Sequence, residues 1–243
     1  MRVEQAIFTS ARSTTVQGYH LVGRSPGIDS PLAQTLTRWG PSHGSLAGPA
    51  PDADSFNFHP AGDGWVALSR TVYGAPEYSA RGGLQLVTSF LVLRHEQLAG
   101  YDYNPVLLAR VALALGHLRL RPVNPVRLPA VELPDRPICG PTISSDRAGW
   151  AGSMERLWHL SKSCERVAVG GASDPLGLAA DLISRVPGHQ RVELSFTTGL
   201  KPTLSRPFRL HFVCSADAAL RRLLTTQGIA FFSASDAASI HPA

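Results

Sequence analysis

Residues 3–10 read VEQAIFTS, and residues 18–27 read GYHLVGRSPG. Apolar side chains alternate or run together in both stretches, which is the pattern of β-strands with at least one buried face. The polar residues 10–17 between them predict a loose turn, and the Ser-Pro-Gly step at residues 25–27 ends the second strand. The chain therefore begins with a predicted β-hairpin, and a sheet is the base of the fold.

Two further strands and two helices are predicted before residue 120. Residues 65–73 and 84–93 have strand patterns. The second is nearly continuous in apolar residues, so we expect it near the centre of the sheet. Helices are predicted to begin at Ser30 and Asn104, because each precedes a proline and can cap the first turn.

Two long segments lack apolar periodicity. Residues 41–63 are rich in Gly, Pro, Ser and Asp and predict a long loop anchored by Phe56 and Phe58. Residues 121–152 contain prolines at positions 122, 125, 129, 134, 137 and 141. Because proline lacks an N–H and disrupts helices and central strands, this segment predicts an extended connection. It is either an exposed linker or an arm docked across the first half, and its apolar residues favour the arm.

The second half alternates helices and strands. Helices are predicted at residues 153–163, 175–186 and 217–226, and strands at residues 166–169, 192–198, 208–214 and 229–232. This order predicts an α+β fold in which helices cover mixed sheets, with the proline-rich segment as an extended connection. The predicted units are an N-terminal α+β half (1–120), the connection (121–152) and a C-terminal α/β-like half (153–243), or one continuous domain.

Composition excludes a disordered chain and gives little support to a nucleic-acid-binding one. Hydrophobic residues make up 44% of the chain and charged residues 17%. The net charge of +5 comes almost wholly from arginine, since Lys162 and Lys201 are the only lysines. The arginines are scattered, so a nucleic-acid groove is an alternative that the sequence does not indicate. The apolar stretches are shorter than the ~20 residues of a membrane helix, so we predict a cytoplasmic protein without membrane contact.

No catalytic, metal or cofactor constellation is predicted. Cys139, Cys164 and Cys214 are too few and too widely spaced for a disulfide framework or a zinc site. His159 and Cys164 would diverge by about 140° on a helix, and His211 and Cys214 would point to opposite faces of a strand. No two histidines have metal-ligand spacing on a helix.

One glycine-rich segment offers an alternative. Residues 170–175, between a strand and a helix, could meet a phosphate at the helix N-terminus. A cap made by Ser173 or Asp174 explains the segment without a ligand and is favoured.

Three parts of the chain resemble one family. Residues 3–27, residues 70–93 with YGAPEYSARGG at 73–83, and residues 182–213 with RVELSFTTG at 191–199 are similar to the N-terminal domain of the GTPase-associated proteins of bacterial NTP-dependent conflict systems. The resemblance implies a regulatory or adaptor role beside a GTPase or effector in a multi-protein defence assembly.

The middle segment departs from the family pattern at two positions. Leu84 stands where the pattern leads us to expect asparagine, and Thr88 stands where we expect histidine. Any chemistry that those polar side chains carry in relatives is not expected in this chain.

The predicted partner-binding surface is the glycine-rich turn flanked by Arg70, Tyr73, Tyr78 and Arg81. Arginine and tyrosine are over-represented at binding hot spots. The alternative is a hairpin turn whose tyrosines cover the sheet edge. We therefore predict a non-enzymatic adaptor that binds a GTPase or effector of the same system. A hydrolase-like enzyme with an unrecognised site and an arginine-rich nucleic-acid-binding subunit are the alternative functions.

Overall fold

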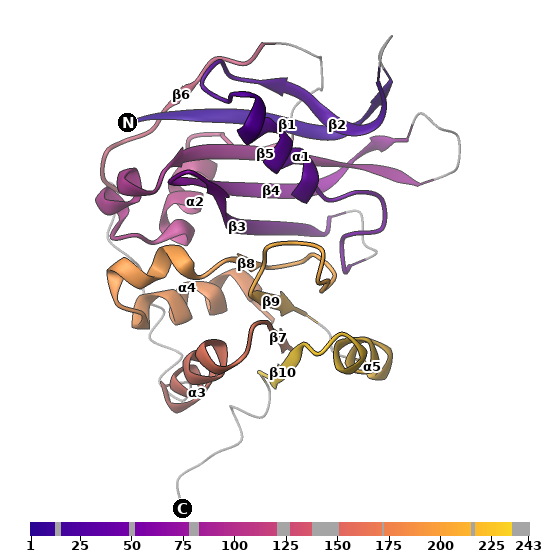
Figure 1. The fold of residues 1–243 in the computed structure, drawn as a ribbon, viewed down its shortest axis with the longest axis vertical. Coiled ribbons are helices and arrows are strands. Elements are labelled where there is room, and N and C mark those ends of the chain that lie inside the picture. Colours follow the sequence, from indigo (N-terminus) through magenta and orange to yellow (C-terminus); the bar gives the residue numbers. More distant parts are fainter. Residues whose placement is uncertain are drawn as a thin grey trace, which may run out of the picture.

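One mixed sheet of ten strands runs through the described part of the chain (Figure 1). The computed structural model describes residues 1–12, 16–48, 52–77, 83–120, 127–137, 151–171, 173–214 and 217–234. Across the sheet the strands are β10 (Ala230–Ser233), β7 (Val167–Gly170), β9 (Leu210–Val213), β8 (Phe196–Thr197), β3 (Asp54–Gly62), β4 (Trp65–Pro76), β5 (Leu84–Arg94), β1 (Arg2–Arg12) and β2 (Gln17–Arg24), while β6 (Val131–Glu132) also pairs with β1. Helices cover this sheet, and the α+β prediction is confirmed.

The N-terminal part of the sheet is antiparallel. β1 and β2 form the predicted hairpin, and β1 also pairs with β5. The helix α1 (Ser30–Trp39) lies across one sheet face and buries Leu32 and Leu36. Its predicted cap was wrong by one residue, because the Asp29 carboxylate, not Ser30, accepts a hydrogen bond from the Leu32 N–H at 2.9 Å. A carboxylate at this position also interacts favourably with the helix dipole.

The prediction of a loop over residues 41–63 was wrong, because β3 occupies its second half. Phe56 and Phe58 are buried in the largest core cluster, on one face of the strand. The alternate residues Ser55 and Asn57 are polar and yet almost fully buried on the other face. β3 therefore lacks the usual strand pattern, in which apolar residues face the core and polar residues face solvent.

The C-terminal part of the sheet is parallel. α3 (Ala151–Ser163) and α4 (Pro175–Arg185) pack in the same core as Val167 and Val169 of β7. The helix α5 (Ala218–Thr226) packs on the opposite face, against Ala168. No helix in the described ranges has the length and apolar content needed to cross a bilayer.

The strand predicted at residues 192–198 is shorter than expected. Its first two residues belong to the 3₁₀ helix η3 (Gly188–Glu193), and only Phe196–Thr197 forms β8. β8 nevertheless joins the two halves of the sheet, because it pairs antiparallel with β3 and parallel with β9. The rings of Phe58, Phe196 and Phe212 follow one another across this seam, with centroid separations of 6.1 and 6.4 Å.

The described part of the proline-rich segment, residues 127–137, docks on the first half. Val131 pairs with Val3 of β1, and the Leu128 N–H donates to the Arg24 carbonyl at 3.2 Å. The Tyr101 hydroxyl, at the end of η1 (His95–Tyr101), donates to the Pro134 carbonyl at 2.7 Å. These contacts make residues 127–137 a docked arm with one short edge strand.

Replacing Gly100 by alanine should loosen this arm. An alanine Cβ at this position would lie 2.0 Å from the Asp135 carbonyl oxygen, so the backbone of the arm or of η1 must shift. We expect a loss of about 2 kcal/mol in unfolding free energy and faster proteolysis within residues 127–137. Gly188→Ala is the matched control, because its added Cβ meets its nearest neighbour at 3.5 Å. Equal proteolysis of both variants would contradict a tightly docked arm.

Candidate protein-interaction site

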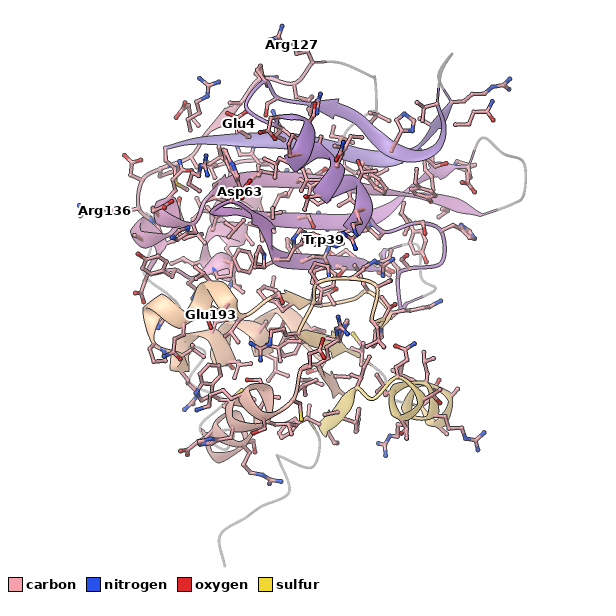
Figure 2. The ribbon with its side chains drawn as sticks, viewed as in Figure 1. Glu4, Trp39, Asp63, Arg127, Arg136 and Glu193 are labelled. Carbon is pink, nitrogen blue, oxygen red and sulfur yellow. The ribbon has the colours of Figure 1, made fainter. Side chains whose placement is uncertain are left out.

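A groove of about 1060 Å³ lies between β2, the last strand of the sheet, and α1. Residues 20–26 form one wall, Ala33, Gln34, Thr37 and Arg38 of α1 form the other, and Arg127 of the docked arm lies at one end. Figure 2 shows Arg127 at the margin of the molecule, beyond β2. We call this feature the β2–α1 groove.

A β-bulge in β2 decides which side chains face the groove. Phe8 of β1 is opposite Leu21, whereas Ala6, two residues earlier, is opposite Arg24. β2 thus advances three residues where β1 advances two, and the extra residue reverses the alternation of side chains. Phe8 and Ala6 pack in the cluster beneath α1. Because directly opposed residues share a face, the bulge places Arg24 on the α1 face.

The groove is electropositive. Arg24, Arg38 and Arg127 are exposed at its margin, and no carboxylate is among its lining residues. In the described ranges none of these three guanidinium groups makes an ion pair. The Arg24 Nη1 donates to the Asp29 carbonyl, at 3.2 Å. Three arginines around one groove, with no carboxylate among the described residues that line it, favour an anionic partner.

A family model described as GTPase-associated protein 1, N-terminal domain type 2 matches residues 2–134, which is more than half of the chain. The chain belongs to this family. The residues that line the β2–α1 groove all lie within the matched segment. No curated protein and no solved structure matches the chain.

The GTPase-associated domain does not bring Arg70 and Tyr73 together. Both lie within β4, and residues three apart on a strand project from opposite faces. The Arg70 guanidinium pairs with the Asp54 carboxylate at 2.8 Å and lies 5.5 Å from the centroid of the Phe56 ring. The Tyr73 hydroxyl donates to the Gly48 carbonyl at 3.2 Å. Tyr78 and Arg81 lie outside the described residues, as does Cys139.

Sequence reasoning missed a buried set of polar residues that crosses β8, β3, β4 and β5. We call it the polar ladder; its members are Ser55, Asn57, Ser69, Thr71, Thr88 and Thr197. The Asn57 Oδ1 accepts hydrogen bonds from the hydroxyls of Ser55 and Thr197, both at 2.7 Å. The Asn57 Nδ2 donates to the Ser69 hydroxyl at 3.2 Å. Because these side chains bond one another in the interior, the polar ladder holds strands together.

The polar ladder also accounts for one departure from the family pattern. Thr88, where the resemblance led us to expect histidine, forms a hydrogen bond with Thr71 at 2.9 Å between the two hydroxyls. Alternating polar residues in β3 and β4 were the available signal in the sequence. That signal is ambiguous, because the same alternation is typical of a strand with one solvated face.

Two buried histidines, His59 and His211, both contact the Phe208 ring. Ring centroids are 5.7 Å apart for His59 and Phe208, and 6.2 Å apart for Phe208 and His211. His59 also meets Trp39 edge-on at 5.1 Å, and Figure 2 shows Trp39 over β3. Burial lowers the pKa of each imidazole to about 4, and the charge of Arg166 adds to the lowering at His211. Both rings are therefore neutral near pH 7.

The remaining sequence hypotheses concern ligands. Asp174 caps α4, because its Oδ1 accepts from the Gly177 N–H at 2.8 Å, so the predicted cap is confirmed at Asp174. His211 is buried whereas Cys214 is exposed. Within the described ranges, no three His, Cys, Asp or Glu side chains are grouped so that they could hold a metal.

Proposed function

We propose that this chain is a non-enzymatic adaptor or regulatory module that holds a GTPase, or an effector linked to one, in a multi-protein bacterial defence assembly. Membership in the GTPase-associated family supports the link to a GTPase. The β2–α1 groove supports the adaptor role, because three arginines that make no ion pair in the described part of the chain lie beside β2, which pairs there with β1 alone. Open edges and charged grooves are surfaces that other proteins recognise.

Charge reversal in the groove tests this proposal. Arg24, Arg38 and Arg127 are changed to Glu together, and capture of a candidate GTPase from the same defence system is compared between the variant and the parent chain by co-purification. We expect at least a tenfold loss of captured GTPase, because attraction becomes repulsion at three points. The melting temperature should stay nearly constant, since all three side chains are exposed and none of them makes an ion pair within the described residues.

A matched control reverses the same number of charges elsewhere. Arg110, Arg156 and Arg222 are exposed on α2 (Pro105–Ala114), α3 and α5, and none of them lines the groove. Equal loss of GTPase in both triple variants would indicate an effect of net charge and refute the proposal. The surface predicted around Arg70 and Arg81 remains a prediction, and Arg70→Ala with Arg81→Ala tests it in the same assay.

A further inference from the structure

We infer that the occupant of the β2–α1 groove is an acidic, extended segment of a protein partner, which adds a strand to the outer edge of β2. This inference rests on the proposed function and names the chemistry of the partner. It depends on three features of the structure. These are the outer edge of β2, the arginines beside that edge, and the docked arm, whose extended backbone already bonds to the end of β2 and pairs with β1.

The first feature is the edge itself. β2 has eight residues and pairs with β1 alone in the described part of the chain. Every second residue of an edge strand directs its N–H and C=O groups away from the sheet, and these groups can bond an added strand. Gln17 is exposed and residues 18–22 are partly exposed, so an incoming backbone can reach them.

The second feature is the position of the charges. The bulge turns Arg24 toward α1, so that it shares the groove with Arg38 on the opposite wall. Arg127 of the docked arm adds a third positive charge. A strand lying against β2 projects alternate side chains toward the α1 face. Carboxylates at those alternate positions would meet the guanidinium groups, which bind carboxylates in a bidentate geometry.

The third feature is the docked arm. Residues 127–137 lie extended along the same end of the sheet, and the Leu128 N–H donates to the Arg24 carbonyl at the last residue of β2. The same arm pairs with β1 through Val131 and Glu132. Extended backbone therefore already bonds to the end of β2. A second segment that continues along β2 would occupy the remaining length of that edge.

Synthetic peptides test the inference with the full chain. The probe is a fluorescent peptide of about ten residues in which glutamate alternates with valine or threonine. Two further versions carry N-methyl groups on alternate backbone amides, one version for each edge of the peptide, and a fourth replaces glutamate with lysine. Fluorescence anisotropy measures binding. Hydrogen exchange of residues 17–24 reports whether the β2 amides become protected.

The expected result is specific to strand addition. The acidic peptide binds, the version methylated on the pairing edge binds at least about tenfold more weakly, and the lysine version does not bind. The groove variant, with Arg24, Arg38 and Arg127 changed to Glu, binds the acidic peptide at least about tenfold more weakly. The control variant, with Arg110, Arg156 and Arg222 changed to Glu, binds it with unchanged affinity. Exchange slows within residues 17–24 when the acidic peptide is added.

Two outcomes would overturn the inference. If both methylated peptides bind as well as the parent and β2 exchange is unchanged, the groove does not accept a strand. If single-stranded oligothymidylate displaces the acidic peptide and itself protects β2, the groove holds nucleic acid. If the peptide experiment fails but the groove variant still loses GTPase capture, only strand addition is refuted. Capture that survives the groove variant refutes the proposed function itself.

Discussion

Replacing Asn57 by leucine is expected to lower the free energy of unfolding by about 3 kcal/mol. The two side chains are similar in size, but leucine removes both the acceptor and the donor at the centre of the polar ladder. The hydroxyls of Thr197 and Ser69 then lose the partners that they have at 2.7 and 3.2 Å, in a region without access to solvent. Equilibrium unfolding in urea measures the loss.

Ser69→Ala is the control for the polar ladder, because it deletes one peripheral hydroxyl and should cost only about 1 kcal/mol. The Asn57 variant should also weaken the junction between the two halves of the sheet, since Asn57 and Thr197 are paired residues of β3 and β8. A second unfolding transition would reveal this weakening. If Asn57→Leu costs no more than Ser69→Ala, the polar ladder does not stabilise the fold.

Acidification from about pH 7.5 to about pH 5 is expected to lower the stability by about 4 kcal/mol in total, through His59 and His211. Burial lowers the pKa of both from 6.5 to about 4, so the folded chain keeps both rings neutral over this interval. The unfolded chain regains the ordinary pKa and binds protons below pH 6.5. Stability is therefore fully present above pH 6.5 and falls as the pH approaches 4.

His211→Leu provides the control for this pH dependence. The Phe208 backbone partly offsets the lowered pKa of His211, but among the described residues neither ring nitrogen has a hydrogen-bond partner of good geometry. Replacement by leucine therefore removes no well-formed hydrogen bond, so the stability at about pH 7.5 should be nearly unchanged. The variant should lose about half of the pH dependence of the unfolding free energy. An unaltered pH profile in this variant would show that His211 does not titrate on unfolding.

Local signals in the sequence predicted much of the secondary structure. The apolar run of β5 and the strands of the β1–β2 hairpin were predicted within a few residues of their observed ends. The helix α2 begins after Asn104, whose side chain accepts hydrogen bonds from the backbone N–H groups of Val106 and Leu107. These features depend on residues close to one another in the chain, which is why the sequence reveals them.

β3 and the polar ladder could not be predicted in the same way. Ser55 and Asn57 resemble loop residues until β4 and β8 lie beside them and supply Ser69 and Thr197 as hydrogen-bond partners. The separation between Asn57 and Thr197 is 140 residues. No local pattern encodes a contact over that distance.

The sequence by itself determined the fold class, the family and an arginine-rich composition. Only the tertiary structure decided which arginines line the β2–α1 groove. Arg24, Arg38 and Arg127 are scattered in the chain, and they meet because a bulge turns Arg24 toward α1 while the arm returns Arg127 to the end of β2. The physical reason is that a bulge depends on the register between two paired strands, and register is set by packing across the sheet rather than by the residues of either strand alone.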